Sequence, residues 1–188
     1  MIKIFNSVNL SNTLEVPEDN KIFIEGYAMH FNTVNMNGEM VIPGAFDEFF
    51  EILKDKKNMP IFDVFHQQDN IIGAWTDIRQ DETGLWVEGF LDLNVQYVRD
   101  NIAPLVRNGA LSNLSTEMWI SFDDIEQKED HYIVKKAMLT GISLVSIGAD
   151  MDTRFTIKNA LEEPKDEKNI SENNIAEPKS KNVLLFYI

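Results

Sequence analysis

The residues best suited to chemistry in this sequence are one serine and three histidines. Ser115 lies in GALSNLSTEM, residues 109–118, where apolar and polar residues begin to alternate as they do in a β-strand. Apart from Thr116, the even positions that follow are apolar: Leu114, Met118, Ile120 and Phe122. Successive side chains point to opposite faces of a strand, so we expect Ser115 to point away from the apolar face.

A serine hydroxyl is a weak nucleophile at its ordinary pKa and needs a base to remove its proton. The histidines of the chain are His30, His66 and His131. His66 follows a short apolar stretch, PIFDVF, and begins a polar loop. Catalytic side chains are common where a rigid element meets a loop, which makes His66 the candidate base. The alternative is a surface or hydrogen-bonded structural histidine.

Other chemistries lack a supporting motif. His30, His66 and a carboxylate such as Glu39 would suit zinc, but their spacing contains nothing like HExxH. The sequence has no Gly-rich phosphate loop and no serine within a GxSxG motif. His131 lies beside a charged turn and is expected to be exposed to solvent. We therefore predict no metal and no cofactor.

Composition narrows the class of protein. With 188 residues and 44% hydrophobic content, the chain is long enough for one domain with a sizeable core. A net charge of −14 argues against a direct nucleic-acid partner, because phosphate binding needs clustered Lys and Arg. The absence of cysteine excludes disulfides and thiolate sites. With no signal peptide and no apolar run near the roughly 18 residues that a membrane span needs, the protein is predicted to be soluble and free of membrane contact.

Periodicity places the elements of the first half of the chain. A strand is predicted over Lys21–Met29, which is rich in Ile, Phe and Tyr. After Pro43, apolar residues at helical spacing predict an amphipathic helix that ends near Lys57. A short strand leads into His66, and from Ile71 two further strands follow, joined by a turn.

In the second half, a helical stripe covers Val95–Val106, and Pro104 interrupts it. We expect either a kink there or a short second helix that Gly109 terminates. The strand with Ser115 comes next, then a charged turn and a strand over His131–Lys136. The last strand, over Ala137–Ile147, is apolar on both faces, which predicts a central place in a sheet or barrel.

The ends of the chain differ from its middle. Residues 1–160 are predicted to form one domain, which includes a strand at Met1–Phe5. Glu162–Lys181 has dense charge and no aromatic residue, which is typical of a disordered linker. The final six residues, Val183–Ile188, are apolar again. They would suit a docking peptide, a protease recognition segment, an added strand or a tail without function, so residues 161–188 are predicted to be a flexible linker and tail.

These segments occur in an order that resembles a known family. The order is FIEGYAMHFNTVNMNGEMVIPGAF, a strand ending in His66, then Ile72-Gly73, GLWVEG, GALSNLS and ISLVSIGAD. It is similar to the tailed-phage prohead, or procapsid maturation, serine proteases, which are distant relatives of herpesvirus assemblin. The resemblance covers roughly residues 20 to 157. No single segment is specific, but the ordered set is.

The resemblance implies an α+β fold with a mostly antiparallel β-barrel core flanked by a few helices. It implies a serine endopeptidase without a cofactor, in which His66 is the base and Ser115 the nucleophile. Such proteases work inside the immature procapsid in the host cytoplasm, where they cut scaffold protein, or a scaffold domain, and major capsid protein, and usually themselves. Self-association is a further expectation. Glu162–Lys181 is a candidate site of self-cleavage, because disordered chain is accessible to a protease.

One position departs from the family pattern. Many members have an acidic residue two positions before the serine of a Ser-Leu-Val stretch, and here, counting back from Ser143, that residue is Gly141. Glu117 lies on the same face as Ser115, roughly 6 to 7 Å along the strand, and Asp150 follows the last strand. Either carboxylate would serve to orient the histidine. Each also has a simpler explanation, as a solvent-facing strand residue or a loop cap.

Three alternatives therefore remain from the sequence. The first is a catalytic dyad of reduced activity. The second is a catalytically impaired assembly or scaffold protein on the same fold, which the glycine at position 141 favours and the intact His66 and Ser115 disfavour. The third is another small hydrolase or a binding barrel, and a small-molecule ligand without a capsid partner would support it.

Overall fold

The computed structural model describes residues 18–54 and 59–158. The predicted strand at Met1–Phe5, the linker, the apolar segment Val183–Ile188 and the domain boundary after residue 160 lie outside the described residues. They stay predictions. No helix in the described ranges has the length and apolar character needed to cross a membrane.

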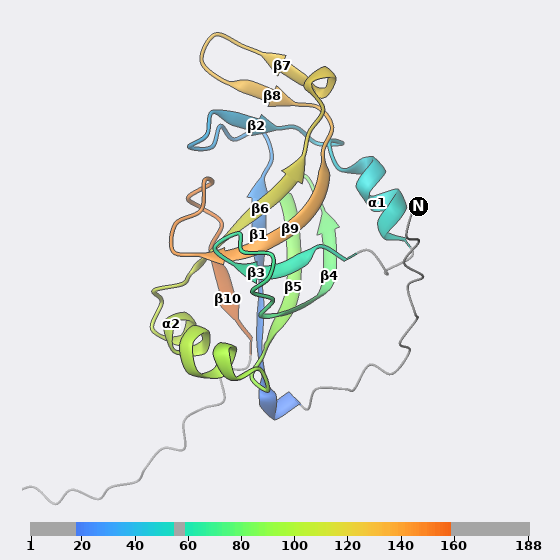
Figure 1. Ribbon diagram of the computed structural model, residues 1–188. Coiled ribbons are helices and arrows are strands. Elements are labelled where there is room, and N and C mark those ends of the chain that lie inside the picture. Colours follow the sequence, from blue (N-terminus) through green and yellow to red (C-terminus); the bar gives the residue numbers. More distant parts are fainter. Residues whose placement is uncertain (1–17, 55–58, 159–188) are drawn as a thin grey trace, which may run out of the picture.

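The described residues form a mixed α+β fold of mostly antiparallel strands with two short α-helices (Figure 1). The elements are η1 (Glu18–Asn20), β1 (Lys21–His30), β2 (Glu39–Val41), α1 (Asp47–Leu53), β3 (Ile61–Val64), β4 (Gly73–Gln80), β5 (Gly84–Asp92), η2 (Val98–Ile102), α2 (Ala103–Arg107), β6 (Asn113–Trp119), η3 (Phe122–Asp124), β7 (Ile125–Gln127), β8 (Tyr132–Val134), β9 (Met138–Val145) and β10 (Phe155–Ile157). The strands make three sheets, ordered β10-β1-β5-β4, β2-β8-β7 and β3-β9-β6. The α+β class is therefore confirmed.

The core lies between the four-stranded sheet and the β3-β9-β6 sheet, which cross in Figure 1. Alternation along β1 buries Ile22 and Ile24, and β9 is buried over most of its length. The ring of Phe62 on β3 stacks on Trp75 of β4, with 4.0 Å between centroids, and joins the two sheets. The predicted central place of the strand over Ala137–Ile147 is confirmed, because β9 lies between β3 and β6, but it is not the final strand, since β10 follows it.

The helices follow the apolar spacing of the sequence. α1 buries Phe49 and Leu53, and Phe46 before it is fully buried. The helix begins four residues after Pro43, which lies in the preceding turn. In the second helical region the chain makes a π-helical turn, η2, and then α2, with Pro104 in the first turn, where its missing N–H is tolerated. Neither alternative describes this region fully: the backbone stays helical from residue 96 to Arg107, and the π-helical turn η2 precedes Pro104 without a break.

A barrel core was predicted, and this prediction is wrong: no closed barrel is found in the described residues. One edge of β1 pairs with β5 and the other with β10. Between β6 and the residue just before β10 there is only an isolated bridge, from Asn113 to Arg154. The sheets therefore stay open. Alternation in a sequence reports which side chains are buried, whereas closure depends on which strand edges share hydrogen bonds.

The third sheet, β2-β8-β7, forms the upper end of the molecule in Figure 1. The sequence predicted the strand that contains β8, over His131–Lys136, but not β2, β7 or β10; all four strands have only three residues. Pairing explains them: β8 binds β2 in parallel on one side and β7 antiparallel on the other. Large aromatic side chains nearby are exposed, among them Trp119 at 75% and Phe122 at 94%.

The close approach of β4 to β5 supports a test of this packing. A Cβ atom placed on Gly73 would lie 1.8 Å from the carbonyl oxygen of Phe90 on the paired strand. We expect Gly73→Ala to lower the free energy of unfolding by at least about 2 kcal/mol, because backbone must move to admit the methyl group. Urea denaturation measures this. The exposed neighbour variant Ala74→Ser is the control and should change stability by less than about 0.5 kcal/mol; equal midpoints for the two variants would contradict the packing.

Candidate active site

Ser115 and His66 meet at the surface of the β3-β9-β6 sheet. The Nε2 atom of His66 lies 3.0 Å from the Oγ atom of Ser115, although 49 residues separate them along the chain. Ser115 is in the middle of β6, on the face opposite the buried Leu114, as the alternation predicted. The side chain of His66 is 41% exposed, so substrate can reach the pair.

The backbone around His66 is bent to reach this position. β3 runs parallel to β9, and just after it the N–H of Phe65 donates to the carbonyl of Leu144, at 3.0 Å. Phe65 and His66 both have a φ of 57°, in the left-handed region, which costs about 1 kcal/mol per residue. This turn directs the imidazole across β9 toward β6. Strain of this kind is concentrated at functional sites.

Glu117 lies behind the histidine. Its Oε1 atom is 3.2 Å from His66 Nδ1, and its Oε2 atom accepts a hydrogen bond of 2.9 Å from the side-chain amide of Gln68. Burial, the largest single influence, raises the pKa of Glu117, but hydrogen bonds from Gln68, His66 and Ser143 outweigh it and leave the pKa below its ordinary value. The carboxylate is therefore kept ionised beside the imidazole, the arrangement that stabilises an imidazolium.

The glycine that departs from the family pattern makes this arrangement possible. Gly141 on β9 is the direct cross-strand partner of Glu117 on β6. A Cβ atom at Gly141 would lie 2.9 Å from Glu117 Oε1 and 3.2 Å from its Cδ. The Glu117 carboxylate thus lies where a side chain at position 141 would be. An acidic group is present next to the histidine, and it comes from the neighbouring strand.

Two buried polar residues that the sequence analysis missed complete the network. Ser143 Oγ is 3.1 Å from His66 Nδ1 and 3.1 Å from Glu117 Oε1. It also contacts Oδ1 of Asp63, and both Ser143 and Asp63 are fully buried. Burial, as the main cause, raises the pKa of Asp63. The signal that could have revealed Asp63 is a carboxylate inside the otherwise apolar strand IFDV.

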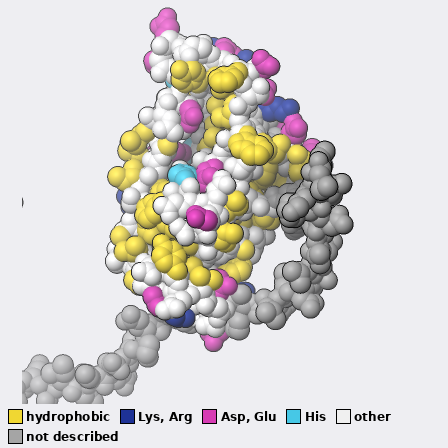
Figure 2. Space-filling model, in the orientation of Figure 1, with side chains coloured by type: hydrophobic (Ala, Val, Ile, Leu, Met, Phe, Trp, Pro, Cys, Tyr) yellow, Lys and Arg dark blue, Asp and Glu magenta, His cyan; other side chains and the backbone are white. Residues whose placement is uncertain are grey.

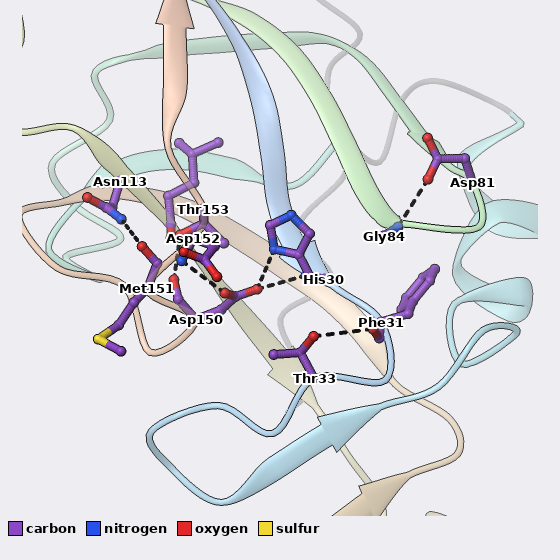
Figure 3. A network of polar contacts seen from close by, with 11 residues as sticks. His30, Phe31, Thr33, Asp81, Gly84, Asn113, Asp150, Met151, Asp152 and Thr153 are labelled. Atoms are coloured by element: carbon purple, nitrogen blue, oxygen red, sulfur yellow. Dashed lines mark hydrogen bonds and ion pairs between the residues drawn. The ribbon is translucent and has the colours of Figure 1, made fainter.

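The second acidic candidate, Asp150, has a different partner (Figure 3). Its Oδ2 atom accepts hydrogen bonds of 2.8 Å from both the ring Nδ1 and the main-chain N–H of His30, and its Oδ1 atom accepts one from the N–H of Asp152. Asp150 therefore ties the loop after β9 to the end of β1. His131, predicted to be exposed, contacts Asp130 at 2.7 Å and has a side chain only 20% exposed.

Two cavities open beside the serine. The first, of about 110 Å³, is largely enclosed between the end of β1, the segment leading into β2, and β6; Glu39, Asp150 and Ser115 are among its lining residues. The second is a wider groove of about 600 Å³, with Phe65, Ile147 and Met36 along it and both His66 and Ser115 in its wall. In Figure 2 a histidine with acidic side chains beside it is exposed on a face that carries many hydrophobic side chains.

Three viral proteases are among the solved structures to which this chain is similar. The capsid assembly protease of bacteriophage T4 superimposes with a TM-score of 0.54 and 15% identity, covering 65% of this chain and 80% of that one. The proteases of varicella-zoster virus and KSHV give TM-scores of 0.46 and 0.48 at 12% and 13% identity; they cover 73% and 74% of this chain and 64% and 65% of their own. The T4 likeness shows a shared fold.

Sequence comparison extends this. The prohead protease of Enterobacteria phage HK97 is 26% identical over 100 residues, which are 53% of this chain and 43% of that protein. The match thus spans less than half of that relative's length. The family model described as caudovirus prohead serine protease matches residues 10–167, most of the sequence. The resemblance inferred from the ordered motifs is therefore confirmed, and the chain belongs to the caudovirus prohead serine protease family.

Proposed function

We propose that this protein is a serine endopeptidase of procapsid maturation. The observation that carries the proposal is the contact of 3.0 Å between His66 Nε2 and Ser115 Oγ, with the Glu117 carboxylate on the other side of the imidazole. Nucleophile, base and orienting acid in this order are the parts that acyl transfer requires. Ser115, His66 and Glu117 take these three roles.

The chemistry proceeds in two halves. As Ser115 Oγ attacks the peptide carbonyl and forms a C–O bond, its proton passes to His66 Nε2. When the C–N bond breaks, His66 returns that proton to the leaving amine. A water molecule then attacks the acyl-enzyme ester by the same route and regenerates the serine. Glu117 stabilises the positive charge that His66 carries between the two proton transfers.

The position of Glu117 also bears on the alternatives. Gly141 had suggested a dyad or a catalytically impaired assembly protein on this fold. The carboxylate of its cross-strand partner lies in the room that this glycine leaves, so an acid accompanies the histidine. This favours an active protease over both alternatives.

The substrates follow from the family. One relative by sequence is a prohead protease, and a protein of similar fold is a capsid assembly protease, so we propose scaffold protein or a scaffold domain and major capsid protein as substrates. The place of action is then the interior of the immature procapsid in the host cytoplasm. We also propose self-cleavage within Glu162–Lys181, and self-association as its route. No cofactor, membrane or direct nucleic-acid contact is part of this function.

Intact mass spectrometry over time tests the proposal. Wild type and Ser115→Ala are incubated at concentrations that allow cutting between molecules, first alone and then with the cognate capsid and scaffold proteins. Wild type should produce fragments and Ser115→Ala should not. Fragments from both proteins would indicate a contaminating protease, and intact substrates in every mixture would move the assignment to a non-catalytic assembly role.

A further inference from the structure

Asp63 is a fully buried carboxyl group that the mechanism above does not use. It lies on β3 with an exposure of 0%. Its Oδ1 atom contacts Ser143 Oγ, and its Oδ2 atom has no hydrogen-bond partner among the described residues. An ionised carboxylate buried with a free oxygen is costly, so its state of protonation must be explained by the groups around it.

The hydroxyl of Ser143 is at the centre of this network and carries a single proton. It contacts Asp63 Oδ1, Glu117 Oε1 and His66 Nδ1. To accept the proton of Ser115 at Nε2, His66 must be neutral and protonated at Nδ1. The Nδ1–H group then donates toward Glu117 and Ser143. The Ser143 hydroxyl can therefore donate to only one of the two carboxyl groups.

Two ionised carboxylates would leave this network one proton short. One of the contacts of Ser143 would join two oxygen atoms with no hydrogen between them, and two negative charges would face each other across one hydroxyl. A single added proton on Asp63 removes both problems. Asp63 Oδ1–H then donates to Ser143 Oγ, and the Ser143 hydroxyl donates to Glu117 Oε1. Each close contact then has one donor and one acceptor.

The surroundings of the two carboxyl groups decide which one holds this proton. The charged or titratable groups that Asp63 faces are Glu117 from β6 and His66 from the end of β3, while β9 contributes only the Ser143 hydroxyl. Glu117 is partly exposed and accepts a hydrogen bond from Gln68. Burial raises the pKa of Asp63, and hydrogen bonds lower that of Glu117 despite its own burial. The proton therefore belongs on Asp63.

We propose that Asp63 is held as a neutral carboxylic acid and acts through Ser143 as a positioning residue, keeping the Glu117 carboxylate ionised and directed at His66. The effect of Asp63 on catalysis rests on the proposed protease function. The protonation state of Asp63 does not rest on it, and separate experiments measure the effect and the protonation state.

The activity test uses an amide that imitates the neutral acid. Asp63→Asn has the same shape and presents an N–H to Ser143, so kcat/KM should fall no more than about threefold. Asp63→Ala removes the donor and should lower kcat/KM by about tenfold or more, and Ser143→Ala should do the same. Thermal melts identify any variant that fails to fold. Equal losses in folded Asp63→Asn and Asp63→Ala would overturn the proposal.

The pH profile separates this role from a merely structural one. If Asp63 is neutral throughout the working range, Asp63→Asn should leave the acid limb of kcat/KM where it is in wild type. If Asp63 is an ionised partner of the histidine, Asp63→Asn should move that limb to lower pH, because a nearby anion favours the protonated imidazole. A limb at lower pH would therefore overturn the proposal.

A measurement without catalysis reads the proton itself. In protein labelled with ¹³C at aspartate carboxyl groups, the resonance missing from Asp63→Asn is that of Asp63. At neutral pH it should have the chemical shift of a protonated acid, and it should have the same shift in the inactive variant Ser115→Ala. A carboxylate shift at neutral pH would overturn the proposal. If no variant cleaves any substrate, the protease function fails while this resonance still decides the state of Asp63.

Stability gives a second independent readout. A carboxyl group whose folded pKa is raised stabilises the fold below its unfolded pKa, and that stability is lost as the pH rises through the folded pKa. As the pH rises above the ordinary aspartate pKa of 3.8, the melting temperature of Asp63→Asn should therefore increase relative to that of wild type. A constant difference across this window would contradict a raised pKa and overturn the proposal.

Discussion

Replacing His66 by alanine should lower the rate of substrate cleavage by about 10⁴-fold or more, because Ser115 then has no base to take its proton. The expected loss is large since the imidazole contacts the hydroxyl of the proposed nucleophile, Ser115, directly, at 3.0 Å. Cleavage of the cognate scaffold protein, followed by gel densitometry, measures it. Labelling of Ser115 by an alkyl fluorophosphonate, which reacts with activated serines, should be lost in parallel.

His131→Ala is the matched control for this experiment. His131 is a partly exposed histidine whose side chain contacts its neighbour Asp130, so its loss should leave cleavage and labelling within about twofold of wild type. Circular dichroism confirms that both variants are folded. Normal labelling of Ser115 in folded His66→Ala would show that the serine is activated by another group.

Glu117 and Gly141 give the second large effect, and the two positions must be tested together. Glu117→Gln keeps the shape of the side chain and removes its charge, so the rate should fall by at least about 10²-fold, because the imidazolium loses its counter-charge. Gly141→Ala should also impair the enzyme. Its methyl group would lie 2.9 Å from Glu117 Oε1 and displace the carboxylate from His66.

Exchange of the two residues tests whether activity needs a carboxylate beside His66, whichever of the two strands supplies it. In the double variant, Glu117→Gly with Gly141→Glu, the glutamate is on β9 instead of β6, at the cross-strand partner position. Its side chain extends into the space that the Glu117 side chain leaves. The double variant should recover at least about tenfold of the activity lost in Glu117→Gly alone. Single-substrate kinetics on wild type, Glu117→Gly, Gly141→Glu and the double variant measure this coupling. If the losses of the two single variants simply add in the double variant, the two positions are not interchangeable.

Alternation explains why much of the site was predictable from the sequence. It placed Ser115 on the outer face of β6 and Glu117 beside it, since residues two apart lie on one face of a strand. It also identified β9 as central, because a strand covered on both sides and both faces must be apolar throughout. His66 was found by its place at the junction of a strand and a loop.

Relations between strands were not predictable in this way. Nothing in the local sequence shows that Gly141 lies opposite Glu117, or that Ser143 contacts Asp63 across the parallel pair of β3 and β9. Both facts depend on register, which is set by packing of the whole sheet. The choice between Glu117 and Asp150 stayed open in the sequence for the same reason, because only the fold brings the loop of Asp150 to His30.

The order β3-β9-β6 determines when the proposed site can first assemble during synthesis of the chain. Of these three strands β9 comes last along the chain and lies in the middle, so β3 and β6 are joined only through β9. His66 and Ser115 therefore reach their contact only after translation has passed Val145. Such non-local strand pairing is slow compared with local folding. The site proposed above is therefore incomplete until β9 has been inserted between β3 and β6.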